Sequence, residues 1–353
     1  MLNLDDPKLY GEVDRSDMLG RIRELPEACR QAWRQASAFD LVGDYSGLKE
    51  VVFLGMGGSA IGGDFLASLL AAEGGVPLMV CRDYNLPAFV GPSTLVVASS
   101  YSGETEETLS AFSQALTIPA RKLAISTGGK LKTMAQQAGV PLFPLSYKAQ
   151  PRAAFGYSFI SLVALFQKMG LLADKAKDFE ETLATVEGLV AELDVHSPLT
   201  KNQAKKVATK LQGRLAVIYG AGILAEVARR WKTQLNENSK AWAFHEVFPE
   251  LNHNAVVGYN FPSDIAGRIF VVLLSSPSLH PRIRLRYRLT AELLARAGVE
   301  SETIEARGSS PLCQMMSIVT LGDFVSYYLA VLYKADPSPV AVIDWLKQRL
   351  SEG

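Results

Sequence analysis

The chain has 353 residues, of which 48% are hydrophobic and 20% charged, and its 36 basic residues balance 36 acidic ones. A formal net charge of zero excludes the global basic field that attracts nucleic acid or an anionic membrane surface. The polar N-terminus is not typical of a signal peptide, and the apolar stretch 157–173 is short and interrupted for a membrane span. We therefore expect a cytoplasmic protein with no nucleic acid and no membrane among its partners.

The first half of the chain alternates short apolar runs with helical patterns. N-terminal helices are expected within 14–38, and strands at 51–54, 77–81, 94–98 and 122–126, with helices at 65–72, 106–116 and 131–138. Residues 140–145 can form only a short edge strand because Pro141 and Pro144 interrupt the run. The alternation predicts an α/β fold with a doubly wound parallel sheet.

A second round follows the helices expected at 158–193. It comprises a strand at 215–219, a glycine turn, a helix at 222–235, a strand at 270–274, a helix at 284–297, a strand at 302–305 and a helix at 312–332. Residues 236–259 are expected to be irregular, with Glu237 where the preceding helix ends. The two rounds share their order of elements, which indicates a divergent repeat and two similar domains packed face to face.

The expected domain organisation has four parts. Residues 1–150 would form the N-terminal helices and the first domain, and 151–200 a helical connector. Residues 201–335 would form the second domain, and 336–353 a C-terminal tail helix. The three cysteines, Cys29, Cys81 and Cys313, are too far apart to indicate a disulfide framework or a zinc site.

Two loops of the first domain follow strands at the sheet edge where ligands of open parallel sheets bind. Backbone N–H groups at a helix N-terminus favour an anion, and converging hydroxyls suit a phosphate monoester. The residues expected to bind phosphate are Gly57, Gly58, Ser59, Ser100, Ser102 and Thr105. The alternative is capping alone, because Ser and Thr commonly precede helices. The loop 275–282 of the second domain lacks the same pattern, so we expect one phosphate site per chain.

A dinucleotide site is the second reading of the first loop. Gly55, Gly57 and Ala60 fit a loose Gly-x-Gly-x-x-Ala pattern, and Asp83 lies where a ribose-binding acid would be. A dinucleotide fold does not need the second, hydroxyl-rich loop, so NAD ranks below phosphate. The four histidines include no pair at one-turn spacing, and no Gly-x-Ser-x-Gly motif occurs. We expect neither a metal nor a cofactor.

Several motifs together resemble one family. They are Gly57-Gly58-Ser59, the run from Ser100 to Thr108, Glu237-Asn238 and the run from Pro249 to Asn254. The sequence is similar to the bifunctional phosphoglucose/phosphomannose isomerases, which are built of two sugar isomerase (SIS) domains. The resemblance covers nearly the whole chain, including residues 151–156 and 336–350.

The resemblance implies an aldose–ketose isomerase that interconverts glucose 6-phosphate and mannose 6-phosphate with fructose 6-phosphate through a cis-enediol. It implies that Glu237 is the base that moves a proton between C2 and C1. His253 would open the sugar ring with Lys347 as its helper, and Arg152 would stabilise the enediolate. In the family the histidine comes from the partner subunit, so the resemblance also implies a homodimer.

Each of these roles has a plainer alternative. Lys347 could be a solvated charge, Arg152 could pair with an acid, and His253 could cap a turn. Glu104 stands where the family more often has Asn, and its carboxylate would repel a phosphate unless it points away or bonds to backbone. A non-catalytic sugar-phosphate sensor is the alternative function, because SIS domains also occur in regulators.

Overall fold

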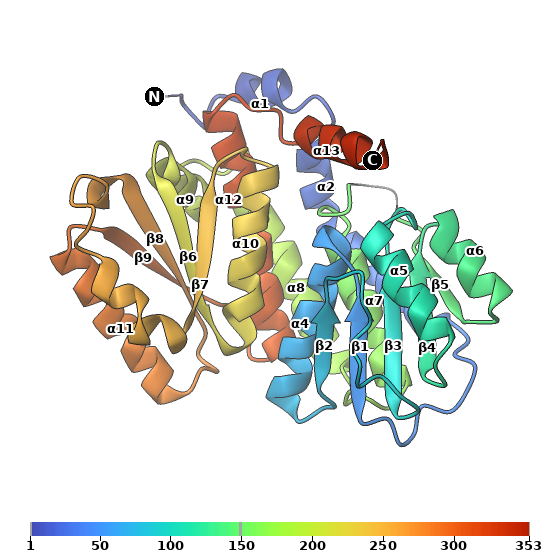
Figure 1. Cartoon of the computed structure of the whole chain (residues 1–353). Helices are drawn as coiled ribbons and strands as arrows, with labels where there is room; N and C mark the ends of the chain where they lie inside the picture. Colours follow the sequence, from blue (N-terminus) through green and yellow to red (C-terminus); the bar gives the residue numbers. More distant parts are fainter. Residues whose placement is uncertain (1, 148–149, 353) are drawn as a thin grey trace. The chain divides into compact units, whose positions relative to one another are not determined.

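The computed structural model describes residues 2–147 and 150–352, and it contains two parallel sheets surrounded by helices (Figure 1). The chain packs into two compact units. The N-sheet unit comprises Glu24–Thr185 and Gly308–Gln314, and the C-sheet unit comprises the residues up to Arg23, Val186–Arg307 and those from Met315 onward. The predicted α/β class with two parallel sheets is therefore confirmed. The domain bounds at residues 150, 200 and 335 stay a prediction.

The N-sheet unit has five parallel strands in the order β2-β1-β3-β4-β5. They are β1 (Glu50–Leu54), β2 (Leu78–Cys81), β3 (Thr94–Ser99), β4 (Arg121–Ser126) and β5 (Leu142–Pro144). Their helices are α3 (Leu25–Ala38), α4 (Gly57–Glu73), α5 (Glu106–Leu116), α6 (Gly129–Gln137), α7 (Phe155–Lys168) and the start of α8 (Ala176–Leu193). Strand β2 is added on one side of β1 and β3 on the other, so the strand order reverses between β1 and β3 and their carboxyl ends form the topological switch point. The short edge strand β5 confirms the prediction for 140–145.

Alternate residues of β1 face the two helical layers of this unit. Val52 and Leu54 belong to an apolar cluster with residues of α5 and α6. On the other side, the ring of Phe53 lies so close to Gly63 of α4 that a Cβ there would come within 2.7 Å of it. Phe53 pairs with Val80 and Val97 in the neighbouring strands. Because both faces are covered, the central strands read as continuous apolar runs, and this is why they could be predicted.

The C-sheet unit has four parallel strands in the order β7-β6-β8-β9, which repeats the order of the first four strands of the other sheet. They are β6 (Leu215–Ala221), β7 (Ala243–Phe248), β8 (Ile269–Ser275) and β9 (Glu300–Glu305). The helices are α1 (Lys8–Val13), α2 (Met18–Arg23), α9 (Gln203–Leu211), α10 (Ala225–Glu237), α11 (Pro281–Arg296), most of α12 (Pro311–Leu332) and α13 (Ala341–Ser351). Short 3-10 helices are η1 (Gly222–Leu224), η2 (Glu250–His253), η3 (Ala255–Gly258) and η4 (Ala266–Arg268).

The expectation of irregular backbone over 236–259 is wrong in part. Helix α10 continues to Glu237, and β7 then forms the edge of the sheet. Phe244 and Glu246 on β7 are exposed, whereas Ala243 and Phe248 are buried. A one-sided edge strand of this kind lacks the unbroken apolar run of a central parallel strand, so its sequence resembles a loop.

Helix α12 is long and apolar enough to span a membrane, but its apolar residues are entirely buried within the protein. It is a core helix. Its Gly322 lies against the indole of Trp231 on α10, where a Cβ would come within 2.3 Å of Nε1. The indole N–H donates to the carbonyl of Ile318, one turn earlier in α12. The missing side chain thus lets α10 and α12 pack closely together.

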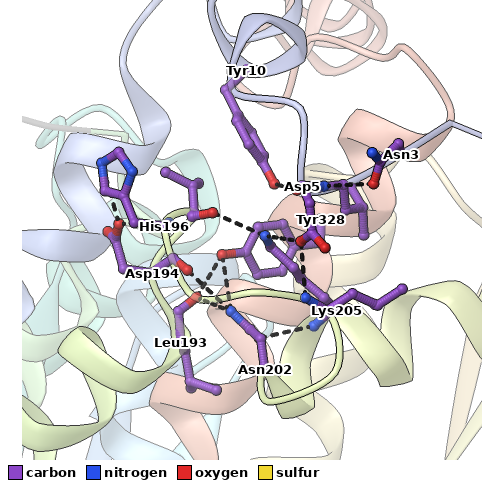
Figure 2. Close-up of polar contacts among 12 residues, drawn as sticks. Asn3, Asp5, Tyr10, Leu193, Asp194, His196, Asn202, Lys205 and Tyr328 are labelled. Atoms are coloured by element: carbon purple, nitrogen blue, oxygen red, sulfur yellow. Dashed lines mark hydrogen bonds and ion pairs between the residues drawn. The ribbon is translucent and has the colours of Figure 1, made fainter.

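The N-terminal residues are attached to the C-sheet unit by a buried lysine, as Figure 2 shows. The side chain of Lys205 is fully buried, and its ammonium donates to Oδ1 of Asp5 at 2.9 Å and to the carbonyl of Val195 at 2.9 Å. It also lies 5.7 Å from the ring centre of Tyr328, within the range of a cation–π contact. The hydrogen bond from Lys205 lowers the pKa of Asp5.

Glu181 on α8 fixes the loop that leads into α12. Its carboxylate accepts the N–H groups of Ser309 at 2.6 Å and Ser310 at 3.1 Å, and the hydroxyl of Ser309 at 2.6 Å. Burial alone would raise the pKa of Glu181, but these hydrogen bonds outweigh it and lower the pKa to about 2. Because the pKa in the folded protein lies below the ordinary value of 4.5, this stabilisation is present above pH 4.5 and is lost as the pH falls toward 2.

We therefore expect Glu181→Gln to destabilise the protein by about 1 kcal/mol at pH 7, after allowance for solvent screening, and by less near pH 3. Thermal unfolding followed by circular dichroism between pH 7 and pH 3 measures the difference. Glu180→Gln, which changes an exposed glutamate of the same helix, is the control. A difference from wild type that stays constant across this range would contradict the assignment.

Candidate functional site

The two loops expected to bind phosphate meet in the N-sheet unit. Gly57 begins α4 with a backbone φ of +49°, directly after β1. The hydroxyl of Ser59, in the first turn of α4, accepts the N–H of Tyr101 in the loop after β3 at 3.0 Å. Since β1 and β3 are neighbours, this bond joins both loops at the switch point of the sheet. The N-termini of α4 and α5 therefore lie at one edge, where their dipoles favour an anion.

Thr105 occupies the N-cap position of α5, but its side chain does not cap the helix. Its hydroxyl instead bonds to the buried hydroxyl of Ser100 at 2.8 Å, and Ser100 also accepts the N–H of Gly103 at 3.0 Å. Ser102 accepts the N–H of Glu104 at 3.2 Å. Capping alone thus does not explain Thr105, and the loop is held in shape by its own hydroxyls.

Glu104 bonds to backbone, as the sequence led us to expect of a carboxylate beside a phosphate site. Its Oε1 accepts the N–H of Lys130 at 2.8 Å in the first turn of α6, and its Oε2 lies 3.5 Å from the ammonium of Lys130. The negative charge is therefore placed against a helix N-terminus and a cation.

Arg152 lies beside the first loop. A Cβ on Gly58 would come within 3.0 Å of Pro151 and 3.2 Å of the backbone nitrogen of Arg152, so the absence of a side chain at Gly58 permits this approach. Arg152 itself is buried. The structure thus brings this predicted site residue next to Gly58 within one unit.

Gly103 is the residue of the second loop that we expect to tolerate substitution least. Its φ is +73°, and a Cβ there would lie 1.9 Å from the carbonyl oxygen of Gly128. We expect Gly103→Ala to displace the loop and to weaken binding of inorganic phosphate at least about 10-fold, because the N–H bonded to Ser100 must move. Isothermal titration calorimetry measures the affinity.

The control for this variant is Gly74→Ala at the C-terminus of α4. Gly74 also has a positive φ, +77°, but a Cβ there would meet no atom within 4 Å. It carries the backbone strain of the substitution without the clash, so its phosphate affinity should equal that of wild type. Equal loss of affinity in both variants would contradict the steric argument.

Glu237 is the last residue of α10 in the C-sheet unit and is half-buried. Its backbone carbonyl accepts a hydrogen bond from the ammonium of Lys240 at 2.5 Å. The same ammonium donates to the carbonyl of Pro337 at 3.2 Å, in the segment that precedes α13. Lys240 therefore connects the end of α10 to the tail. This role of Lys240 could not be predicted, since a lysine with a φ of +55° carries no sequence signal of its backbone conformation.

His253 ends η2 and is exposed, on backbone that its neighbours hold in place. The amide of Asn252 donates to Thr290 at 2.8 Å and accepts from Arg286 at 3.2 Å, both on α11. The amide of Asn254 donates to Glu250 at 2.8 Å. Among the described residues, no hydrogen bond is made by the imidazole of His253, so it caps no turn there.

Lys347 lies on α13, where all residues from 341 to 350 are exposed. Large apolar side chains of this helix are exposed with it, among them Val342, Trp345 and Leu350. Within the described part of the chain, Lys347 is a solvated charge.

Two of the other histidines have structural surroundings. His280 caps α11, because its Nδ1 accepts the N–H of Arg282 at 3.1 Å. A side chain thus occupies the position that an anion would take in a second phosphate site. Burial and the nearby charges of Arg229 and Lys232 lower the pKa of His245 on β7. Asp83 closes a turn by accepting the N–H of Asn85, so its carboxylate has a local partner in place of a ribose.

Comparisons with known proteins identify relatives along nearly the whole chain. A family model described as bacterial phospho-glucose isomerase C-terminal SIS domain matches residues 200–350. The chain is 42% identical over 336 residues to a bifunctional phosphoglucose/phosphomannose isomerase of Caldicellulosiruptor bescii, covering 95% of this chain and 99% of the relative. A protein of the same name from Aquifex aeolicus is 34% identical, covering 89% and 94%.

A solved structure, the tagatose-6-phosphate ketose/aldose isomerase of Escherichia coli, has a TM-score of 0.68 at 18% identity. The aligned region covers 92% of this chain and 95% of that structure. At this identity the likeness concerns the fold, and it agrees with two SIS domains.

Proposed function

The chain belongs to the bifunctional phosphoglucose/phosphomannose isomerase family, and on that premise we propose that it interconverts glucose 6-phosphate and mannose 6-phosphate with fructose 6-phosphate. It is an aldose–ketose isomerase. The observation that carries the assignment is the alignment of 95% of the chain at 42% identity to a curated isomerase of both sugars. The two joined loops at the switch point of the N-sheet unit supply a suitable place for the phosphate.

The reaction transfers a proton between C2 and C1 while the carbonyl group moves in the opposite direction. We assign the transfer to Glu237, since a carboxylate can take the proton from one carbon and return it to the other. In the cis-enediol C2 is planar and has no configuration. Return of the proton to one face of C2 gives glucose and to the other face gives mannose, so one base serves both sugars when the enediol turns about its C2–C3 bond and presents either face to it.

Opening the sugar ring requires a proton to leave O1 and another to reach O5. We assign this step to His253 with Lys347 as its helper. His253 is exposed on a well-anchored turn, and Lys347 is exposed on α13. Both side chains are therefore accessible to another copy of the chain. We propose a cytoplasmic homodimer in which the partner subunit receives His253.

The phosphate is assigned to the loops of Gly57, Gly58 and Ser59 and of Ser100, Ser102 and Thr105. Arg152 is assigned to the enediolate, whose developing charge a guanidinium stabilises. The backbone of Arg152 lies beside Gly58, in the loop expected to hold the substrate's phosphate, and this supports the assignment.

The test is the formation of fructose 6-phosphate from each aldose separately, in the presence of a chelator. We expect turnover of both sugars. Turnover of glucose 6-phosphate alone would remove the mannose activity from the proposal. Saturable binding of either sugar with no turnover would favour the non-catalytic sensor, and saturable binding of NAD would favour the oxidoreductase.

A further inference from the structure

Three polar side chains form a buried row along α10. Arg230, Gln234 and Asn238 are four residues apart, so they share one face of the helix. Each is less than 5% exposed. The helix thus buries one charged side chain and two amides over two turns. Each of these groups needs a hydrogen-bond partner, because an unpaired buried polar group is costly.

The partners are on α12. The guanidinium of Arg230 makes a two-pronged ion pair with the carboxylate of Asp323, whose Oδ1 also accepts from the amide of Gln234 at 2.8 Å. One turn further, the amide of Asn238 donates to the hydroxyl of Ser326 at 3.0 Å. Asp323 is 6% exposed and Ser326 is fully buried. The two helices are thus joined by a polar network along their shared interface.

The network continues to the end of α10. The hydroxyl of Ser326 donates to the backbone carbonyl of Asp323 at 2.9 Å, which fixes the orientation of the hydroxyl. The hydroxyl of Ser239 donates to the carbonyl of Ser326 at 2.7 Å. Asn238 and Ser239 directly follow Glu237, so the residue proposed as the base is adjacent in the chain to two side chains bonded to Ser326.

An apolar interface would hold the two helices together as well as this one. Replacing a buried ion pair with apolar side chains of similar size often leaves stability unchanged or improved. Apolar contacts, however, are non-directional and permit a helix to slide or rotate slightly. Directional bonds at three positions over two turns fix both the rotation of α10 about its axis and its position along that axis.

We propose that Asp323 and Ser326 are positioning residues for Glu237. They act through Arg230, Gln234 and Asn238 and hold the carboxylate of Glu237 at the reacting carbons. The inference rests on the proposed function, in which Glu237 is the base. A displacement of about 1 Å at a catalytic group can lower a rate about 100-fold. The network therefore affects the rate of proton transfer more than it affects stability.

The test replaces the ion pair with apolar side chains in the double variant Arg230→Met/Asp323→Leu. We expect the melting temperature to fall by several degrees, because the buried amide of Gln234 loses its acceptor on Asp323, and KM for fructose 6-phosphate to change less than about 3-fold. We expect kcat to fall about 10-fold to 100-fold. The primary isotope effect with glucose 6-phosphate deuterated at C2 should rise, because proton transfer becomes slower relative to the other steps.

Ser326→Ala is the second variant, and it keeps the test open if the double variant does not fold. It removes the hydroxyl that receives Asn238 and leaves the ion pair intact. We expect a fall in kcat with a larger isotope effect, and Ser326→Thr, which restores a hydroxyl, should recover most of the rate.

The control is Lys205→Met/Asp5→Asn, which removes another ion pair of the C-sheet unit, between the buried Lys205 and the exposed Asp5; among the described residues this pair is not bonded to α10. We expect it to lower stability while kcat and the isotope effect stay as in wild type. If the double variant or Ser326→Ala folds and keeps both wild-type kcat and the wild-type isotope effect, the inference is overturned while the proposed function stands. Absence of turnover in wild type would overturn the proposed function, and this inference with it.

Discussion

Replacing Glu237 with glutamine is expected to lower kcat for glucose 6-phosphate and mannose 6-phosphate by about 1,000-fold, within the range that general base catalysis contributes. Glutamine has nearly the same shape as glutamate, but its amide does not accept a proton from carbon. Glu237 is half-buried and ends α10, and its backbone carbonyl is held by Lys240, a contact that the substitution leaves in place. The loss should therefore be one of chemistry, with the fold preserved.

Coupled assays of both sugars, with circular dichroism to confirm the fold, measure this effect. Glu226→Gln is the matched control, because Glu226 lies on the same helix in its first turn. It should retain wild-type kcat. A Glu237→Gln enzyme that keeps more than about a tenth of kcat with both sugars would remove Glu237 from the role of base.

The largest effect on stability is expected from Gly322→Ala, at about 3 kcal/mol of unfolding free energy. The added Cβ would lie 2.3 Å from Nε1 of Trp231 and 2.5 Å from the neighbouring ring carbon. The indole is buried and bonded to Ile318, so it has no free space to enter. Helices α10 and α12 must then separate, and the bonds from Asp323 and Ser326 to α10 lengthen with them.

Chemical denaturation measures this loss, and Gly188→Ala is its control. Gly188 lies within α8, and a Cβ there would meet no atom within 4 Å. Alanine is the better helix former at an open position, so Gly188→Ala should raise stability by up to about 1 kcal/mol. If Gly322→Ala were as stable as wild type, the close packing of α10 on α12 would be wrong.

The sequence predicted the central strands, which are buried on both faces, and the partly exposed β2, β5 and β9, but it missed the edge strand β7. Residues such as Val52 and Phe53 form unbroken apolar runs because each face of the central sheet meets a helical layer. In β7 the exposed Phe244 and Glu246 break that pattern. The turn-rich residues around it then favoured a loop, and only pairing with β6 makes the segment a strand.

The composition of the phosphate loops could be predicted, but not their internal bonding. Glycines and hydroxyls after a strand identify such a loop, whereas Thr105 stands in a capping position and bonds to Ser100 instead. The partner of Glu104 is Lys130, 26 residues away in the sequence, and a contact of that kind follows from the packing of two loops. The buried row on α10 was missed because charged and amide residues that recur every four positions ordinarily indicate the exposed face of a helix.

The bond between Asp5 and Lys205 joins residues 200 positions apart, and this separation has a consequence for synthesis. At about 5 to 20 residues per second, some 10 to 40 seconds pass on the ribosome between the two. During that interval residues 24–185 can begin to assemble their sheet, while the segment around Asp5 still lacks its lysine. The residues around Asp5 are therefore among those that reach their final place late, and a nascent chain stalled before residue 205 exposes them to proteases.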